Sequence, residues 1–323
     1  MSFTITGTGR AVPERTVTND ELSTMMETSD EWISSRTGIR ERRVLTHETL
    51  LELTAAAGRN ALENAGASPD EIDLLLVTTL QGDYISPSLS CLVAGELGLS
   101  RCTQMLDINM ACCGFLYALD AADSYFRAGK ATKALVISAE AMSRLLDWGD
   151  RSTCVLFGDG AGAAVLEPGD GLLGIRLTVS PGAEHISVGI RGDDSPFENT
   201  HNCFSLRMNG QEIYIFAVSA ITTEIGKILT SHGLTPDDVG HYVLHQANLR
   251  ILESARRKLK QPPEKVPHSI ERYGNTSSAS IPILLDELNR AGTLADGETV
   301  VLCGFGAGLT TGTCLLRWHT SKN

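Results

Sequence analysis

Strand-like and helix-like segments alternate along the chain, and this alternation constrains the fold more than any other feature. Apolar strand patterns cover residues 72–79, 104–109, 133–138, 239–244 and 299–303. Helical patterns cover residues 55–65, 89–97, 114–128, 217–231, 248–259 and 280–291. Because such alternation is typical of layered architectures, we expect an α/β fold.

The order of the segments also indicates a weak internal duplication. In each half of the chain, a strand pattern, a reactive side chain and a long helix pattern follow one another. The turn-forming run 167–171 is the expected junction, so the halves are 1–170 and 171–323. A chain of 323 residues is long enough for two domain-sized units. The polar stretch 181–202 is the expected long surface loop.

Composition excludes several classes of function. The formal charge of −12 disfavours a broad nucleic-acid-binding surface. No stretch approaches the roughly 20 apolar residues that span a bilayer. The N-terminal residues also lack the basic and then apolar pattern of a signal peptide. We therefore expect a cytoplasmic protein with neither a membrane nor a nucleic-acid partner.

The eight cysteines limit the chemistry further. None belongs to a Cys-x-x-Cys pair, so a structural zinc site has little support. A disulfide framework is not expected in a chain of this length without an export signal. We expect no metal and no permanently bound cofactor, and we expect most of the cysteines to be small buried side chains.

Two adjacent cysteines, Cys112 and Cys113, stand between a strand pattern and a helix pattern. A thiol at a helix N-terminus lies against unpaired N–H groups and the positive end of the helix dipole, which favours its thiolate. A nucleophilic cysteine needs this environment. Gly114 lets the helix approach neighbouring backbone closely. The alternative is a buried free cysteine, and the helix argument does not decide which of the two thiols reacts.

Two polar residues downstream are candidates for the same site. His245 ends a strand pattern, where α/β proteins place ligands, and a nearby helix N-terminus should keep its imidazole neutral. Asn275 stands in a Gly-Asn-Thr-Ser run. Taken alone, His245 could equally be a structural histidine, and Asn275 would be read as a turn residue. Together with the cysteine, they indicate covalent acyl chemistry.

Two glycine-rich runs have different expected roles. The run 304–308 (Gly-Phe-Gly-Ala-Gly) follows a strand pattern, and its N–H groups could stabilise an oxyanion or simply form a tight turn. It continues as a strand at 309–311 rather than as a phosphate-binding helix, so it is not a nucleotide-binding motif. The run 157–164 (Phe-Gly-Asp-Gly-Ala-Gly-Ala-Ala) is expected to pack two elements closely together.

The motifs occur in an order that resembles one known family. They are Ser29-Asp-Glu-Trp-Ile33, Arg36-Thr-Gly-Ile-Arg-Glu-Arg42, Ala111-Cys-x-Gly-Phe115, Phe157-Gly-Asp-Gly-Ala-Gly162, His245-Gln-Ala-Asn248 and Gly274-Asn-Thr-Ser277. This set spans essentially the whole chain and resembles the beta-ketoacyl-acyl-carrier-protein synthase III family, the condensing enzymes that start type II fatty-acid synthesis. The resemblance implies the thiolase fold, with two related halves in a five-layered αβαβα arrangement, and a homodimer.

By the same resemblance, Cys112 rather than Cys113 accepts the acyl group from an acyl-CoA primer. His245 and Asn275 would hold the thioester carbonyl of malonyl-acyl carrier protein and stabilise the enolate that decarboxylation leaves. That carbanion then attacks the acyl-Cys112 thioester. The backbone N–H groups of Cys112 and Ala307 would form a second oxyanion hole. The family usually has glycine at the second position, so this donor requires a φ that Ala307 tolerates.

The resemblance also implies where coenzyme A binds. Indole can stack on adenine and guanidinium groups pair with phosphates, which suits the residue types. The implied CoA-binding residues are Thr28, Trp32, Arg36, Arg151 and Asn248.

A basic run at residues 250–258 and the small residue Ser86 indicate which partner and which substrates the chain could bind. Charge runs are usually solvated faces, but the resemblance makes this run a docking patch for an acidic acyl carrier protein. Tyr214 stands where the family often has a lysine, so carrier recognition is expected to be weaker or rearranged. Ser86 stands where the family often has a phenylalanine lining the acyl pocket across the dimer, which predicts tolerance of primers longer than acetyl. The implied docking residues are Arg250, Arg256, Arg257 and Lys258.

Three alternatives stay open. A homologue that loads a starter unit, or that acylates a natural product without decarboxylation, would be favoured by loss of His245 or Asn275, and both are present. A non-catalytic partner subunit usually lacks the nucleophile, which Cys112 supplies. A cysteine hydrolase needs a water route and a base oriented by a carboxylate, and the sequence reveals neither.

Overall fold

The computed structural model describes residues 2–189 and 205–320. Its strands are β1 (Ser2–Ala11), β2 (Thr16–Thr18), β3 (Glu41–Arg43), β4 (Leu74–Thr78), β5 (Gln104–Ile108), β6 (Ala134–Glu140), β7 (Gly160–Gly169), β8 (Leu172–Val179), β9 (Ile186–Val188), β10 (Leu206–Met208), β11 (His241–Leu244), β12 (Thr299–Gly306) and β13 (Thr310–Arg317). Its α-helices are α1 (Asn19–Ser23), α2 (Asp30–Thr37), α3 (Leu50–Ala65), α4 (Leu89–Leu97), α5 (Gly114–Arg127), α6 (Gly210–Ser231), α7 (Leu249–Leu259), α8 (Ile270–Tyr273) and α9 (Ser280–Arg290).

The first large sheet has the strand order β1-β7-β6-β4-β5. β4 pairs in parallel with β5 and β6, whereas β7 pairs antiparallel with β6 and β1. Every residue of β4 and β6 is buried, as expected for apolar strands covered on both faces. β5 is the edge strand, and its Leu106 is 41% exposed.

The second large sheet has the order β11-β12-β13-β8. β11 pairs in parallel with β12, and the other two pairings are antiparallel. β11 ends beside Cys303 of β12, with which Leu244 pairs, and β12 continues to Gly306. The residues that follow these two strand ends therefore reach the same edge of the sheet.

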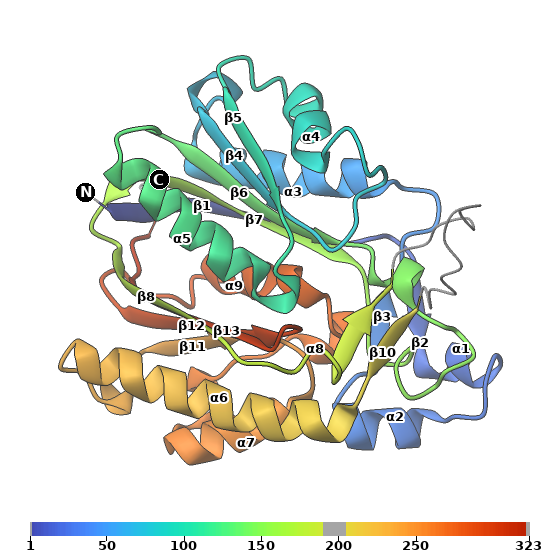
Figure 1. The fold of residues 1–323 in the computed structure, drawn as a ribbon. Coiled ribbons are helices and arrows are strands. Elements are labelled where there is room, and N and C mark those ends of the chain that lie inside the picture. Colours follow the sequence, from blue (N-terminus) through green and yellow to red (C-terminus); the bar gives the residue numbers. More distant parts are fainter. Residues whose placement is uncertain (1, 190–204, 321–323) are drawn as a thin grey trace.

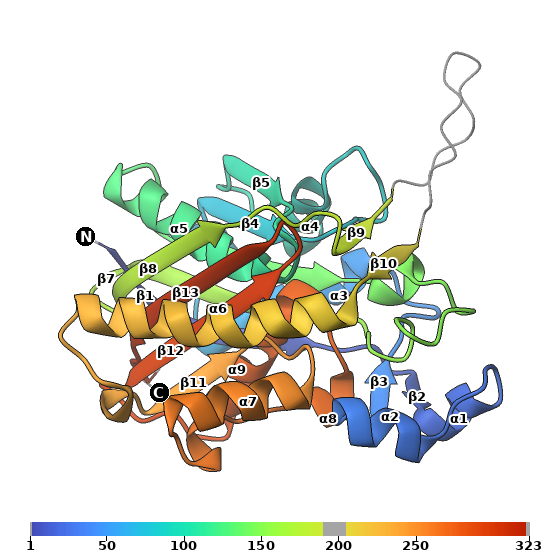
Figure 2. The same cartoon turned by 60° about the horizontal axis from the view of Figure 1, so that its bottom comes forward.

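The helices complete five layers (Figures 1 and 2). α3 and α4 pack on the outer face of the first sheet, and α5 and α9 lie between the two sheets. α6 and α7 cover the outer face of the second sheet. The αβαβα order expected from the sequence is therefore confirmed.

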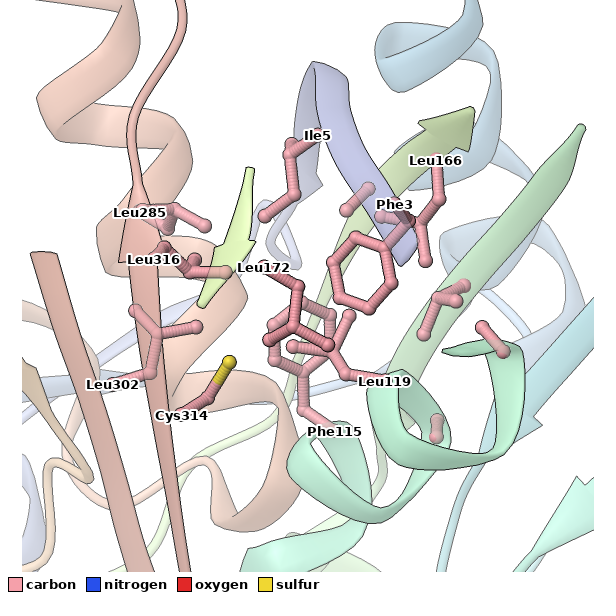
Figure 3. Packing of buried hydrophobic residues seen from close by; sticks show 14 of the residues in the cluster. Phe3, Ile5, Phe115, Leu119, Leu166, Leu172, Leu285, Leu302, Cys314 and Leu316 are labelled. Atoms are coloured by element: carbon pink, nitrogen blue, oxygen red, sulfur yellow. The ribbon is translucent and has the colours of Figure 1, made fainter. Parts of the chain in front are cut away.

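The period of two along each strand divides the apolar residues between layers. Leu74 and Leu76 of β4 face the middle core, whereas Leu75 and Val77 face the outer core beneath α3. The middle core takes side chains from both sheets and from α5 and α9 (Figure 3). Since the halves 1–170 and 171–323 share this core, their status as separate domains stays a prediction.

Helix α6 corrects one expectation. By length and composition it is long and apolar enough to cross a membrane, although no such segment was expected. Its buried residues Ile213, Ala217, Ile221 and Ile225 recur every four residues and join the apolar cluster over β12 and β13. The apolar character of α6 is therefore explained by packing against the second sheet.

Most other expected elements are present, and the differences have local causes. α3 begins five residues earlier than expected, because Thr49 and Glu52 form a capping box. The expected loop 181–202 contains strand β9, which pairs with β10; residues 190–202 lie outside the described residues. All seven described cysteines are free, and all except Cys91 are buried.

Candidate active site

The candidate nucleophile lies on a sharp turn between β5 and α5. Cys112 belongs to a 3₁₀ turn, Ala111–Cys113, and Ala111 has a φ of 45°. A non-glycine residue in this region costs roughly 1–3 kcal/mol, which strained functional turns often carry. Cys112 lines a pocket of about 150 Å³, whereas Cys113 is fully buried and its thiol contacts the Thr310 carbonyl. The pocket therefore distinguishes the two thiols.

The ionisation of Cys112 differs from the sequence expectation. Burial raises the pKa of its thiol to about 12, and nearby Cys113 and Glu140 add to this effect, while a hydrogen bond with the Ser277 side chain lowers the pKa in part. The expectation that the helix N-terminus leaves a resting thiolate was wrong, because desolvation outweighs it. The resting side chain is a neutral thiol, and its proton must move during any reaction.

His245 follows β11 and lines the same pocket. Its ring is 1% exposed, and burial lowers its pKa to about 3, so the imidazole is neutral as expected. Nδ1 lies 2.7 Å from the Ser280 hydroxyl, which also accepts a bond from the Gln246 N–H. Since that hydroxyl can donate to Nδ1, this arrangement favours the tautomer with its proton on Nε2. The imidazole and the Phe305 ring pack in a T-shaped arrangement, with their centres 5.0 Å apart.

Asn275 reaches the pocket from the turn after α8. Its backbone is fixed by two bonds, from its N–H to the Leu156 carbonyl and from the Gly158 N–H to its own carbonyl. Its side-chain oxygen accepts the Ser277 N–H at 2.8 Å. With the oxygen engaged, the amide NH₂ group is the part available to donate.

The end of β12 lies against the nucleophile. A Cβ at Gly306 would come within 3.0 Å of Cys112 Cβ and 3.1 Å of its backbone nitrogen, so only glycine fits here without displacement. Gly306 lines the pocket, whereas Ala307 is not among the lining residues. Among the described residues, Ala307 does not have a positive φ. An alanine therefore tolerates this backbone, as the oxyanion-hole prediction requires.

The residues expected to bind CoA gather beside the pocket. The guanidinium carbons of Arg36 and Arg151 lie 4.7 and 5.2 Å from the centre of the Trp32 ring. Asn248 caps α7, lines the pocket, and donates to the Arg36 carbonyl at 3.2 Å. The Thr28 hydroxyl is buried and has no hydrogen-bond partner within residues 2–189 and 205–320.

The basic run on α7 does not form one uniform face. Arg250 and Arg257 line a shallow groove with Tyr214, and Lys258 is exposed. Arg256 is instead paired with Glu253 at 2.7 Å and donates to the Gln261 carbonyl. Its charge is therefore partly satisfied within the chain.

Ser86 lies on an exposed loop and does not line the pocket that contains Cys112. The neighbouring Tyr84 and Ile85 are 62% and 89% exposed. Within one chain, the structure therefore does not bring Ser86 to the nucleophile.

Three supporting residues were not identified from the sequence. Ser277 and Ser280 belong to the run Ser-Ser-Ala-Ser behind Asn275, where three serines are an unusual way to start a buried helix. Glu140 ends the buried strand β6, and a carboxylate after this mostly apolar run could have been recognised from the sequence. The run 157–164 packs β7 against α9, as expected, since Cβ atoms at Gly160 or Gly162 would meet Ile283 or Pro282. The described part of the chain contains no cluster of three or more potential metal ligands.

Comparison with known proteins connects this site to a family. The model of 3-oxoacyl-(acyl-carrier-protein) synthase III matches residues 106–180, and the C-terminal model of the same synthase matches residues 229–318. A beta-ketoacyl-(acyl-carrier-protein) synthase III from Clostridium acetobutylicum is 41% identical over 322 residues, covering 98% of this chain and 99% of the relative. The chain belongs to this family.

Solved structures of similar proteins agree with the assignment. The 3-oxoacyl-(acyl-carrier-protein) synthase III from Aquifex aeolicus has a TM-score of 0.91 and 40% identity, covering 98% of this chain and all of that one. The priming beta-ketosynthase of the R1128 polyketide pathway has a TM-score of 0.92 and 36% identity, covering 99% and 97%. The thiolase fold expected from the motifs is therefore confirmed.

Proposed function

We propose that this member of the family condenses an acyl-CoA primer with malonyl-acyl carrier protein, releasing carbon dioxide and CoA, to start fatty-acid synthesis. The observation that carries the proposal is that Cys112, His245 and Asn275, from three distant parts of the chain, line one pocket. The reaction needs a nucleophile and two neutral donors, and these side chains supply them. The chain is accordingly an acyltransferase that uses a CoA thioester as substrate.

In the first half-reaction, the Cys112 sulfur attacks the carbonyl carbon of the acyl-CoA thioester. The carbonyl oxygen becomes an oxyanion, which the backbone N–H groups of Cys112 and Ala307 stabilise. Collapse of this intermediate expels the CoA sulfur, which takes up the proton that the Cys112 thiol has lost, and leaves the acyl-Cys112 thioester. The Gly306 approach to the Cys112 backbone supports this assignment, because it brings the two donor segments together.

In the second half-reaction, His245 and Asn275 donate to the thioester carbonyl of the malonyl group. Loss of carbon dioxide leaves an enolate, whose negative oxygen these two donors stabilise. The carbanion attacks the acyl-Cys112 carbonyl and expels the cysteine as a thiolate, which takes a proton from water to regain the neutral thiol. The Ser280 contact to Nδ1 of His245 and the Ser277 contact to Oδ1 of Asn275 support these roles, because each leaves a donor facing the pocket.

CoA and the carrier protein would enter over α2 and α7. Trp32, flanked by two guanidinium groups, suits an adenine ring and phosphates. The exposed Arg257 and Lys258 suit an acidic carrier, with Arg250 at the groove beside them. These sites stay proposals, as do the contributions of Thr28, Asn248 and Arg256.

The chain would act as a cytoplasmic homodimer. β5 offers a strand edge that the described residues leave unpaired, and such an edge can pair with a second copy. The exposed Leu106, Tyr84 and Ile85 lie on this strand and on the loop 84–86, so pairing would cover apolar surface. A homodimer of this kind would bring Ser86 of one chain toward the acyl pocket of its partner.

The deciding experiment uses radiolabelled acyl-CoA and maps the label. Transfer of label to Cys112, with ketoacyl product formed only after malonyl-acyl carrier protein is added, supports the proposal. Label released as free acid would indicate a hydrolase, and a protein that stays unlabelled would indicate a non-catalytic subunit. A Cys112→Ala variant is the control for labelling at another residue.

A second candidate is a priming synthase of a specialised pathway. The similarity to the R1128 priming ketosynthase favours it. The two candidates share the chemistry and differ in the primer. Rates with acetyl-, butyryl- and octanoyl-CoA distinguish them, because a fatty-acid starter enzyme that accepts only short primers would lose activity sharply beyond two carbons.

A further inference from the structure

A fully buried arginine, Arg42, lies beside the pocket and has no role in the mechanism above. It ends the motif 36–42 and belongs to β3. β3 pairs with β2 and packs against α8, the helix that precedes Asn275 (Figure 1). Burying a charged side chain is costly unless its donors find partners, so the partners of Arg42 indicate what it does.

The guanidinium group of Arg42 bonds oxygens on two separate segments. Nη2 donates to the Val155 carbonyl at 2.8 Å. Nη1 donates to Asn19 Oδ1 at 2.9 Å and to the Val17 carbonyl at 3.2 Å. Within residues 2–189 and 205–320, no carboxylate forms an ion pair with this group, and Nε has no hydrogen-bond partner. An apolar side chain could fill the same space without a buried charge, so we attribute the arginine to its bonds with both segments.

One branch of these bonds leads to Asn275. Val155 accepts from Arg42, and the carbonyl of the next residue, Leu156, accepts the Asn275 N–H at 2.8 Å. The Gly158 N–H donates to the Asn275 carbonyl at 3.1 Å. A Cβ at Gly158 would lie 3.0 Å from the Arg42 Cβ, so the stem of the arginine packs on the same segment. Arg42 therefore holds the segment to which the backbone of Asn275 is bonded.

The other branch leads to α2, the helix that carries Trp32. Asn19 is 1% exposed, and its Oδ1 accepts from Arg42. Its Nδ2 donates to Asp30 Oδ1 and to the Ile39 carbonyl, both at 2.8 Å. Since Asp30 is the first residue of α2 and Ile39 follows the C-cap of this helix, Asn19 contacts both ends of α2.

Helix α7 also contacts α2, but only near its last turn. Asn248 and Arg250 donate to the carbonyls of Arg36 and Ser35, at 3.2 and 2.8 Å. Trp32 lies in the first turn, where Asp30 is bonded to Asn19. Without the bonds from Arg42 and Asn19, the first turn should therefore move while α2 stays attached. The expected consequence is a weakened CoA site rather than a lost one.

We propose that Arg42 is a positioning residue for both half-reactions: it fixes the backbone of Asn275 through the Val155 carbonyl, and it places Trp32 for the CoA nucleotide through Asn19. Arg42 itself does not line the pocket that contains Cys112. This inference rests on the proposed function, because it concerns CoA binding and malonyl decarboxylation.

Four variants test the two branches. Arg42→Met keeps the length of the side chain and removes its donors, whereas Arg42→Lys keeps the charge and loses the planar fork that reaches two segments. Asn19→Ala interrupts only the branch to α2. The matched control is Arg43→Met, because Arg43 is the next residue of β3 and its Nη1 donates instead to the carbonyls of Pro13 and Glu14.

Three quantities are measured with each folded variant: the rate of Cys112 acylation at saturating butyryl-CoA, the half-saturating concentration of butyryl-CoA, and the rate of malonyl-acyl carrier protein decarboxylation without primer. In Arg42→Met, decarboxylation should slow about tenfold, because a displaced Asn275 is a poorer donor. The half-saturating concentration should rise about fivefold, the size expected for one lost hydrogen bond. The saturated acylation rate should stay near the wild-type value, because Cys112 and Ala307 receive no bond from Arg42.

The butyryl thioester of N-acetylcysteamine separates positioning from general damage. This thioester lacks the CoA nucleotide, so its half-saturating concentration should be the same in the wild type and in Arg42→Met. An equal rise for both thioesters, equal losses in both half-reactions, or wild-type values throughout would each overturn the proposal. A merely structural arginine would lower both rates together, because less of the protein would be active.

The other variants test the bonding pattern. Arg42→Lys should behave like Arg42→Met, and wild-type values in it would show that the two-segment bond is not needed. Asn19→Ala should raise the half-saturating concentration of butyryl-CoA and keep decarboxylation; an unchanged concentration, or slowed decarboxylation, would overturn the assignment of the branches. Arg43→Met should match the wild type, and the Arg42→Met pattern in this control would also overturn it. If Arg42→Met does not fold, Arg42→Lys and Asn19→Ala decide. The proposed function fails separately, if the wild type neither acylates Cys112 nor decarboxylates the malonyl group.

Discussion

Replacing Glu140 by glutamine should remove a specific part of the pH dependence of stability. Glu140 is buried with neutral partners, and burial raises its pKa from 4.5 to about 7. The native state therefore holds the proton more tightly than the unfolded chain does. At about 1.4 kcal/mol per pKa unit, the difference between 4.5 and about 7 corresponds to about 3 kcal/mol.

The sign follows from proton linkage. The protonated carboxyl favours the native state, so this contribution is complete below pH 4.5 and is lost as the pH rises to about 7. Glutamine has nearly the same shape and does not titrate. Relative to Glu140→Gln, the wild type should therefore lose about 3 kcal/mol of unfolding free energy between pH 4.5 and pH 8. Other titrating groups cancel in this difference.

The assay is urea unfolding of both proteins at several pH values from 5 to 8, followed by circular dichroism. The free energies of unfolding come from linear extrapolation. A constant offset between the two proteins is expected, because the glutamine NH₂ group meets the Leu80 N–H donor. The reasoning would be refuted by an offset that stays the same at every pH, since Glu140 would then titrate alike in both states.

Four further predictions concern activity. Cys112→Ala should abolish transfer of label from acyl-CoA, whereas His245→Ala should keep acylation and lose malonyl decarboxylation, because the enolate loses its donor. Ser280→Ala should slow decarboxylation about tenfold, because Nδ1 of His245 loses its 2.7 Å partner; unchanged decarboxylation would contradict the tautomer assignment. Gly306→Ala should slow acylation, since the new methyl meets Cys112, while the control Gly95→Ala meets nothing within 4 Å and should not. Butyryl-CoA should be a substrate, in line with Ser86, and turnover confined to acetyl-CoA would refute the roomier pocket.

The sequence predicted the layers and most of the elements well. Apolar periodicity is a local property, so the strand patterns at 72–79 and 133–138 correspond to β4 and β6. Boundaries were less accurate, because capping residues such as Thr49 extend helices beyond their apolar stripe. The apolar length of α6 was underestimated, and only its packing on the second sheet explains that length.

The sequence motifs, through the resemblance they carry, also indicated the three residues that line the pocket, but they did not predict the surroundings of these residues. Cys112 stands at a helix N-terminus in sequence and in structure, and local reasoning predicted a thiolate. Burial reverses that expectation, because desolvation depends on every neighbour and not on the adjoining helix alone. Ser86 is a similar case, since a role at the acyl pocket would depend on a second chain.

The order of residue types by itself determined the α/β architecture and the family, and through the family resemblance it indicated Cys112, His245 and Asn275 as candidate site residues. Apolar periodicity and the identities of reactive side chains are properties of the linear sequence and can be recognised without a structure. The tertiary structure decided which groups meet: a thiol kept neutral by burial, a histidine held by Ser280, and Glu140 placed behind Ser277. Charge states and hydrogen-bond partners arise from contacts between residues that are far apart in sequence, so only the folded arrangement could reveal them.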